Sequence, residues 1–238
     1  MDAAGYVTLT RQSGLLREMD TVANNIANIS TNGYRSEGLI FSEYVKSAGP
    51  GAASLSMANA DTRNIDEGQG PLKQTGGTFD LAIEGEGYFL VETPEGQMLT
   101  RAGSFTPDPE GELVAPDGAR LLDSAGAPVF VPADAAEISV AADGTLSVDG
   151  QPFAEIGLYA PVEPNDLNRR SGSRFMPEAG VQPIAGGAIL QGYLEGSNVN
   201  AISEIARMIE VQNAYQQGQK FLEQEDERVR AVIRTLGR

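Results

Sequence analysis

The stretch from residue 197 to residue 236 carries the most regular hydrophobic pattern in the chain. Its apolar positions recur at alternating steps of three and four, an average of 3.5, which predicts a helix with one continuous seam. Capping oxygens at Ser197, Asn198 and Asn200 precede the pattern, Glu204 falls in its first turn, and Gly237 follows its last apolar residue. Residues of these types start and stop helices. The seam consists of Met208, Val211, Tyr215, Gly218, Leu222, Glu225, Val229, Val232 and Leu236.

This predicted helix is about 60 Å long at about 1.5 Å per residue, longer than a compact domain of this size is wide. Part of the seam must therefore pack against another helix or another chain. Gly218 and Glu225 interrupt the seam, because Gly costs about 1 kcal/mol in a helix interior and a seam carboxylate needs a partner. We expect a bend there, or a local contact with something other than leucine. The stripe is widened upstream by Val199, Ile202, Ile205 and Ile209.

A second amphipathic helix is predicted near the N-terminus, between residues 2 and 29. Leu15, Met19, Val22 and Ile26 stand at i, i+4, i+7 and i+11, on one helix face. Helices at both ends predict a paired coiled coil, with the chain leaving and returning to the same place. The pattern leaves open whether this pair is a hairpin within one monomer or part of an assembly between chains. The N-terminal stripe is widened by Leu9, Leu16 and Ala23.

Charge separates the ends of the chain from its middle. Residues 1–35 hold three acidic and three basic side chains, and residues 197–238 hold six of each. The formal charge of −16 therefore lies in residues 36–196, where 24 acidic groups face 8 basic ones. A body with this field repels copies of itself. Self-association is therefore expected through the neutral helices, with the acidic bodies turned toward solvent.

The middle of the chain changes character at about residue 75. Residues 36–75 are rich in Ser and Gly and are predicted to form an extended linker. The residues of this linker that are predicted as possible docking points are Phe41, Tyr44, Val45, Leu55 and Met57.

From residue 76 to residue 193 the hydrophobic period is two, which is typical of strands. Short β-prone runs cover 88–91, 98–100, 112–114, 129–131, 138–140, 146–148 and 156–159. Turn dipeptides that end in Gly96, Gly111, Gly118, Gly144 and Gly150 separate them. The sequence therefore predicts an α+β fold with a mainly antiparallel, barrel-like or sandwich-like central domain. The predicted divisions are 1–35, 36–75, 76–193 and 194–238.

Composition excludes several kinds of function. The 238 residues include no Cys and no His, so a disulfide framework, a thiolate metal site and a histidine base are absent. The acidic balance argues against nucleic acid as a partner, and charged residues interrupt the N-terminal apolar pattern before it could form a signal-peptide core. Gly85–Leu90 begins like a dinucleotide fingerprint but lacks its third Gly, and Asp108, Glu110 and Glu112 lack the spacing of a calcium loop. We expect no catalytic residue, metal, cofactor or small-molecule substrate.

Three motifs lie at both ends and in the middle of the chain. The first motif is Asn24–Asn28 with Thr31, Gly33, Tyr34 and Arg35. The second, at the C-terminal end, is Leu194–Asn200, which leads into Met208–Glu210 and Gln212–Tyr215. The third, in the middle, is Phe79–Phe89 followed by Thr100–Phe105. These motifs resemble those of the bacterial flagellar rod and hook proteins and occur in that family's order. The opening residues are most similar to those of the family's proximal-rod member.

This resemblance implies a non-enzymatic structural subunit of the rod in the flagellar basal body. It further implies a periplasmic location, export through the flagellar type III apparatus without a cleaved signal peptide, and contacts with other rod proteins and with copies of itself. The family-signature residues are Asn24, Asn25, Asn28, Thr31, Gly33, Tyr34, Gly196, Ser197 and Asn198.

Helical assembly through the terminal helices would give a shaft stiff enough to transmit torque. The residues predicted to form the assembly interface are Leu9, Leu15, Leu16, Met19, Val22, Ile26, Val199, Ile202, Ile205, Met208, Ile209, Val211, Tyr215, Leu222, Val229, Val232 and Leu236.

Two alternatives stay open. The chain could be a distal-rod or hook subunit of the same family. It could also be a β domain that binds or hydrolyses carbohydrate and dimerises through a helical hairpin, since 33 acidic residues supply many candidate carboxylate pairs.

Overall fold

The computed structural model of the chain describes residues 3–46, 55–163 and 165–236, with the side chains of residues 3–6 and 41–63 left out. The chain divides into two compact units. The helical unit comprises Met1–Ala27, Glu37–Asp66 and Asn200–Arg238, and the β unit comprises Asn28–Ser36 and Glu67–Val199. The structure is therefore α+β, with a helix at each end and a mainly antiparallel β part between them.

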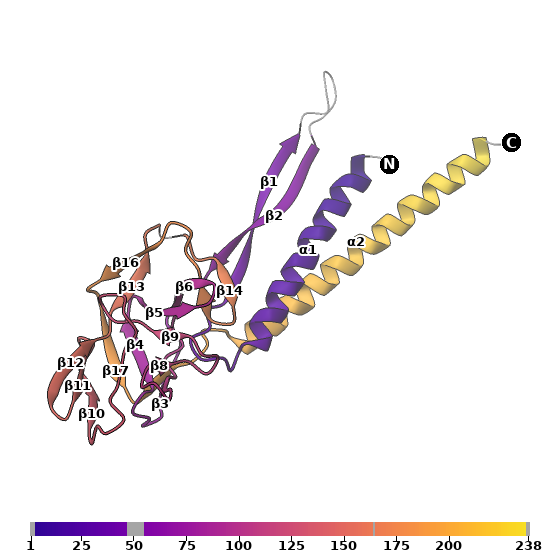
Figure 1. Cartoon of the computed structure of the whole chain (residues 1–238). Coiled ribbons are helices and arrows are strands. Elements are labelled where there is room, and N and C mark those ends of the chain that lie inside the picture. The colour runs from indigo at the N-terminus through magenta and orange to yellow at the C-terminus, as the bar shows by residue number, and fades with distance from the viewer. Residues whose placement is uncertain (1–2, 47–54, 164, 237–238) are drawn as a thin grey trace. The chain divides into compact units, whose positions relative to one another are not determined.

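The helical unit contains two long helices and one β-hairpin (Figure 1). Helix α1 (Ala3–Ala27) and helix α2 (Ala201–Leu236) lie side by side, and the hairpin of β1 (Glu37–Lys46) and β2 (Leu55–Ile65) packs along α1. No helix in the described part of the chain is both long and apolar enough to cross a membrane.

Helix α2 begins at a side-chain cap. The Oδ1 atom of Asn200 accepts hydrogen bonds from the backbone N–H groups of Ile202 at 3.1 Å and Ser203 at 3.2 Å. These are two of the donors that the first turn of a helix leaves without an internal partner. Of the three predicted capping residues, Asn200 is the one that caps the helix. The predicted stop at Gly237 lies outside the described residues.

The hairpin is a difference from the sequence prediction. Residues 36–75 were expected to be an extended linker with neither helix nor good strand, but β1 and β2 pair antiparallel from Glu37 opposite Ile65 to Lys46 opposite Leu55. The register shifts between Ile40 and Ser42. Ser, Asn and Asp dilute the alternation of apolar residues here, so the hydrophobic pattern does not indicate these strands. The expected docking residues lie among the side chains that are not described.

The β unit consists of short antiparallel strands. Nine of them form one sheet in the order β14-β15-β6-β5-β9-β8-β7, with β13 pairing to β5 and to β16. The strands β10, β11 and β12 form a second sheet, and β17 pairs with β4 and β18 with β3. The strands are β3 (Leu72–Gln74), β4 (Leu81–Gly85), β5 (Tyr88–Thr93), β6 (Gly96–Thr100), β7 (Thr106–Pro107), β8 (Leu113–Val114), β9 (Arg120–Leu121), β10 (Ile138–Val140), β11 (Thr145–Val148), β12 (Gln151–Glu155), β13 (Leu158–Pro161), β14 (Arg169–Ser171), β15 (Arg174–Phe175), β16 (Val181–Ile184), β17 (Gly187–Gln191) and β18 (Tyr193–Glu195).

The turns between these strands follow the predicted glycines. Gly96, Gly111, Gly118, Gly144 and Gly150 all have positive φ, between 77° and 122°, a region that side chains avoid. Two expectations for the strands were wrong. Within the described residues the sheets stay open and do not close into a barrel. The run 129–131 forms no strand. Phe130 makes only an isolated bridge to Glu112, and the N–H groups of Val129 and Val131 donate to different segments, at Leu121 in β9 and at Gly111 in a turn.

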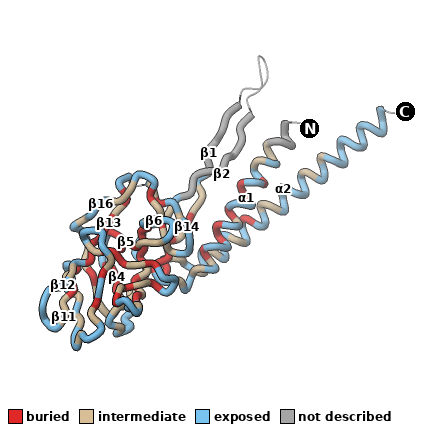
Figure 2. Tube along the Cα trace, in the orientation of Figure 1, coloured by how far each residue is buried: buried red, intermediate tan, exposed pale blue. Residues whose placement is uncertain are grey.

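One hydrophobic core holds the β unit together. It is built from the inward positions of β4, β5 and β6 with residues from β8, β9, β11, β13 and β17. Phe89 and Val91 in it are fully buried, and Figure 2 shows buried stretches running through the β unit. Phe89 and Phe105 meet edge to face at 5.7 Å between ring centroids. Most large apolar side chains of the β unit are therefore buried within the chain, and Ile29, Phe130, Phe153 and Val162 are exposed.

Candidate assembly site

Polar contacts between α1 and α2 fix the two helices as an antiparallel pair. The Asn25 amide donates to Glu204 at 3.2 Å, Arg207 Nε donates to Glu18 Oε1 at 2.8 Å, and Gln12 Nε2 donates to the carbonyl oxygen of Tyr215 at 3.1 Å. Residue numbers fall along α1 as they rise along α2 in these three contacts. The two predicted helices therefore pack within one chain.

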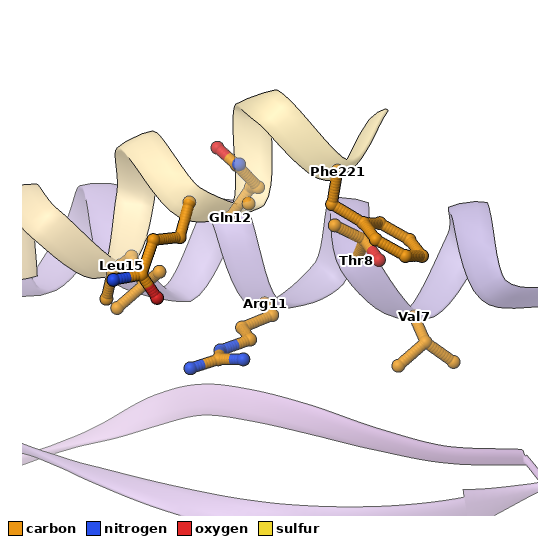
Figure 3. Close-up of a pocket in the computed structure, with 9 residues that line it drawn as sticks. Val7, Thr8, Arg11, Gln12, Leu15 and Phe221 are labelled. Atoms are coloured by element: carbon orange, nitrogen blue, oxygen red, sulfur yellow. The ribbon is translucent and has the colours of Figure 1, made fainter. Parts of the chain in front are cut away.

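Gly218 meets a glutamine where the seam lacks a side chain. A Cβ atom on Gly218 would lie 2.4 Å from Gln12 Nε2, so the glutamine amide occupies the space that a larger residue would fill. In Figure 3 the Gln12 side chain reaches toward α2. The expected contact with something other than leucine is confirmed here. The second interruption, Glu225, is held by Arg228 one turn later, at 2.7 Å.

The predicted interface residues fall into three groups. Leu15, Val22 and Val211 are buried in the chain's own helical unit. The half-buried members are Met19, Ile26, Val199, Met208, Tyr215 and Leu222. The remaining eight are exposed: Leu9, Leu16, Ile202, Ile205, Ile209, Val229, Val232 and Leu236. Part of the seam is thus covered within the monomer, and the exposed remainder lies at the surface of α1 and α2 (Figure 2).

Asn25 in the first motif clamps the start of β1. Its side chain is buried, its Nδ2 donates to the carbonyl oxygen of Glu37 at 2.8 Å, and its Oδ1 accepts from the Glu37 N–H at 3.0 Å. The same amide also reaches Glu204 on α2. One asparagine therefore ties three elements of the helical unit together, which is the specific side-chain role that the asparagine-rich motif suggested.

The later residues of the first motif, from Asn28 to Arg35, belong to the β unit. Gly33 has a φ of +66°, and its N–H donates to the carbonyl oxygen of Glu195 at 2.8 Å. A Cβ atom at Gly33 would lie 2.2 Å from the backbone N of Ala102, so no side chain fits. The next residue, Tyr34, is 1% exposed, and the Arg169 guanidinium lies 4.3 Å from its ring centroid.

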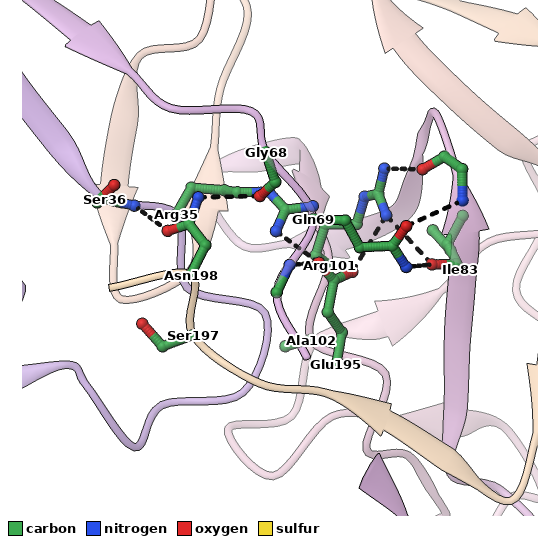
Figure 4. A network of polar contacts seen from close by, with 12 residues as sticks. Arg35, Ser36, Gly68, Gln69, Ile83, Arg101, Ala102, Glu195, Ser197 and Asn198 are labelled. Carbon is green, nitrogen blue, oxygen red and sulfur yellow. Dashed lines mark hydrogen bonds and ion pairs between the residues drawn. The ribbon is translucent and has the colours of Figure 1, made fainter. Parts of the chain in front are cut away.

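Three charged side chains meet at the centre of this region (Figure 4). Glu195 Oε1 accepts from Arg35 Nη1 at 2.5 Å, and Glu195 Oε2 accepts from Arg101 Nη1 at 3.1 Å. Arg35 and Glu195 are fully buried and Arg101 is 4% exposed. We call Arg35, Arg101 and Glu195 the junction triad. The triad joins one residue from each of the three motifs or their immediate flanks.

Backbone groups complete the junction triad. The Gly70 N–H donates to Glu195 Oε1 at 2.9 Å, and Arg101 Nη2 donates to the carbonyl oxygen of Gly85 at 2.6 Å. Burial is the main influence that lowers the pKa of Arg101, and the Glu195 carboxylate opposes it. Two guanidinium cations share one carboxylate, and Arg35 Nε and Nη2 and Arg101 Nε find no hydrogen-bond partner in the described structure. The contacts of the junction triad hold the three motifs in place relative to one another.

The second motif packs its backbone against the chain just before β3. Asn198 Oδ1 accepts from the Ser36 N–H at 2.6 Å, and Asn198 Nδ2 donates to the carbonyl oxygen of Gly68 at 2.9 Å. A Cβ atom on Gly70 would lie 2.2 Å from the carbonyl oxygen of Gly196, which explains glycine at this crossing. Ser197 Oγ accepts from the Val199 N–H at 3.2 Å.

All three charged residues of the junction triad lie inside the sequence motifs, but no role was predicted for them. Arg35, Arg101 and Glu195 each sit beside small or turn-forming residues, and their charges are complementary. That pairing of opposite charges across separate motifs is the signal that could have identified them. Gln12 carried no such signal, because its role depends on Gly218 in another helix.

Comparison with protein families matches all three regions of the chain. The family model "Flagella basal body rod protein" matches residues 6–35, "Flagellar hook protein FlgE/F/G D1 domain" matches residues 82–148, and "Flagellar basal body rod FlgEFG protein C-terminal" matches residues 190–235. The flagellar basal-body rod protein FlgF of Caulobacter vibrioides is 38% identical, with 100% of this chain and 99% of that protein covered. The chain belongs to the flagellar basal-body rod protein family.

Other relatives agree with this placement. FlgF of Rhizobium meliloti is 34% identical over 100% of this chain and 99% of its own length, and FlgG of Bacillus subtilis is 30% identical over 96% and 97%. The predicted resemblance to rod proteins, with greater similarity to FlgF, is confirmed by these identities. Rod proteins are structural, so membership of this family confirms the expectation of a non-enzymatic basal-body component. The relatives do not favour the carbohydrate-directed alternative.

Proposed function

We propose that this rod protein is a proximal-rod subunit that assembles helically through the exposed apolar side chains of its terminal helices. One observation carries the proposal. Eight of the predicted interface residues are exposed on α1 and α2, with Ile202 at 81% and Leu236 at 82%, while the core of the β unit is closed. Exposed apolar surface of this extent on one part of a molecule marks an interaction site.

The energetics favour assembly onto an existing lattice. Burying the exposed half of eight large side chains yields on the order of 10 kcal/mol gross, at about 1.5 to 3 kcal/mol for each full burial. Association of two free proteins costs about 4 to 15 kcal/mol in lost freedom of motion and ordering. A single contact is therefore marginal, and a subunit gains stability when it meets several neighbours at a growing end.

Charge favours the same arrangement. The β unit contains 20 acidic and 7 basic residues, and the helical unit contains 13 and 10, so their net charges are −13 and −3. Copies repel one another mainly through their β units. The proposal therefore places the helices in a paired, coiled-coil-like layer and the β units away from one another. Repetition of head-to-tail contacts gives a helical shaft that resists torsion.

The proposal extends to export and location. The subunit passes unfolded through the flagellar type III apparatus, needs no cleaved signal peptide, and joins other rod proteins and copies of itself in the periplasm. The absence of cysteine suits this route, because a refolding chain without thiols forms no wrong disulfide in an oxidising compartment.

Two valines with matched exposure test the proposal. Val229 on α2 is 46% exposed and Val162 in the β unit is 47% exposed. Expressed in a strain that lacks this subunit, a Val229→Asp chain is expected to be missing from purified basal bodies and to leave cells non-motile, while Val162→Asp incorporates. Circular dichroism checks that both chains fold. Normal incorporation of Val229→Asp would count against assembly through the helices.

A further inference from the structure

A notch between α1 and α2 has the size of a side-chain socket. The hollow has a volume of about 330 Å³, and apolar groups of Val7, Leu15, Ala214 and Phe221 line it (Figure 3). Its α2 wall includes the two small residues Ala214 and Gly218, and Gln12 occupies the space beside Gly218. A cavity of about 150 Å³ is large enough to hold benzene, so this notch has room for two aliphatic side chains.

One polar side chain of the notch, Gln12, already has a partner within the chain. Gln12 lies over Gly218 and donates to the carbonyl oxygen of Tyr215, so its amide has a partner inside the chain. Phe221 at the rim is 41% exposed. The apolar groups of Val7, Leu15, Ala214 and Phe221 offer a surface that suits an apolar side chain.

The far end of α2 presents apolar side chains that no helix among the described residues covers. Gln12 stands nine residues after the first residue of α1 and contacts Tyr215, so the start of α1 lies opposite Gln224, nine residues further along α2. The last twelve residues of α2, roughly 18 Å at about 1.5 Å per residue, extend beyond it. We call residues 225–236 the overhang. Its exposed apolar residues are Val229, Val232, Ile233 and Leu236.

The overhang continues the seam that α1 covers earlier in α2. Its most exposed apolar residues, Ile233 at 63% and Leu236 at 82%, are three positions apart and share one face. Charge does not oppose contact with another helical unit, because the overhang holds three acidic and three basic residues. Asp226 and Arg230 also neutralise each other at 2.8 Å.

We propose that Ile233 and Leu236 of one copy insert into the notch of a second copy. This inference rests on the proposed function and specifies which surfaces meet. Notch and overhang lie at different places on the same unit, so the contact is heterologous and does not close on itself. A contact of this kind adds subunits in one direction and generates a filament. A symmetric contact would stop at a dimer.

A chain with two cysteines tests this contact directly, because the natural chain has none. Gln217→Cys places a thiol in the notch lining, and Val232→Cys places one on the overhang beside the anchors. The two positions are 15 residues apart on one helix, about 22 Å, so they cannot form a disulfide within one chain. Mild oxidation of basal bodies that contain this variant is expected to give a ladder of covalent multimers. Each single-cysteine variant is expected to stay monomeric.

Two controls make the result decisive. Gln216→Cys with Val232→Cys moves the first thiol to a neighbouring residue that does not line the notch, and the ladder is expected to fall about tenfold. Ala214→Leu fills the notch and is expected to remove the ladder, whereas Gln216→Leu preserves it. Motile cells whose basal bodies contain the double variant but show no ladder would overturn the notch contact and leave the proposed function intact. Absence of the unaltered chain from basal bodies would overturn both.

Discussion

Replacing Glu195 by Gln should show how strongly the junction triad holds the β unit. The change keeps the shape of the side chain but leaves the two buried guanidinium cations of Arg35 and Arg101 without a counter-charge. In either orientation, the NH2 group of the new glutamine faces another donor. That donor is a guanidinium N–H or the Gly70 N–H. Removing one partner of a buried ion pair costs about 3 to 5 kcal/mol. A whole domain is stable by about 5 to 15 kcal/mol, so the expected loss is a large fraction.

Urea unfolding of the purified chain measures this loss. The chain has no Trp and seven Tyr, so far-ultraviolet circular dichroism and tyrosine fluorescence are the suitable signals. Glu178→Gln, at an exposed position, makes the same chemical change and is expected to alter the free energy of unfolding by less than about 0.5 kcal/mol. Replacing all three charges of the triad by Met is expected to recover most of the loss, because no buried charge remains. A loss below about 1 kcal/mol for Glu195→Gln would refute this account of the triad.

Three further predictions address single features. Asn25→Ala removes both hydrogen bonds to the Glu37 backbone, so the helical unit should lose about 2 kcal/mol and the Glu37 amide should exchange faster with deuterium. Gly33→Ala puts a Cβ into a neighbouring backbone, whereas Gly118 also has a positive φ, +85° against +66° at Gly33, but has open space around it. Urea unfolding should show a loss above about 3 kcal/mol for Gly33→Ala and about 1 kcal/mol for Gly118→Ala. Burial raises the pKa of Tyr88 above its ordinary 10.0, so its contribution to stability is complete below pH 10 and is lost as pH rises further. Urea midpoints measured above pH 10 should fall less steeply in Tyr88→Phe, with Tyr159, whose pKa burial also raises, supplying part of the remaining slope.

The helices and turns were predictable because their determinants are local. The heptad spacing of α2 depends only on the order of residues in one segment, and Asn200 caps the residues that directly follow it. The turn glycines also determine the structure locally, because each one takes a positive φ at its own position. The resemblance of three motifs to rod proteins identified the family for the same reason, since each motif is a short contiguous run.

The junction triad, the covered part of the α2 seam and the β1–β2 hairpin depend on residues that are far apart in the sequence. Nothing near Glu195 shows that Arg35 and Arg101 will neutralise it, because 160 and 94 residues separate them. The division of the α2 seam into covered and exposed parts depends on where α1 begins. The β1 and β2 hairpin arises from backbone pairing between segments with weak alternation, a property that side-chain pattern does not record.

The central claim is that the exposed apolar ends of the helices are completed by neighbouring subunits. Hydrogen exchange of the isolated chain and of the same chain in purified basal bodies tests it most directly, with the overhang as the reporter. The account predicts fast exchange of the overhang amides in the isolated chain, strong protection in basal bodies, and equal protection of the β-unit core in both. Strong protection of the overhang in the dilute, monomeric chain would contradict it.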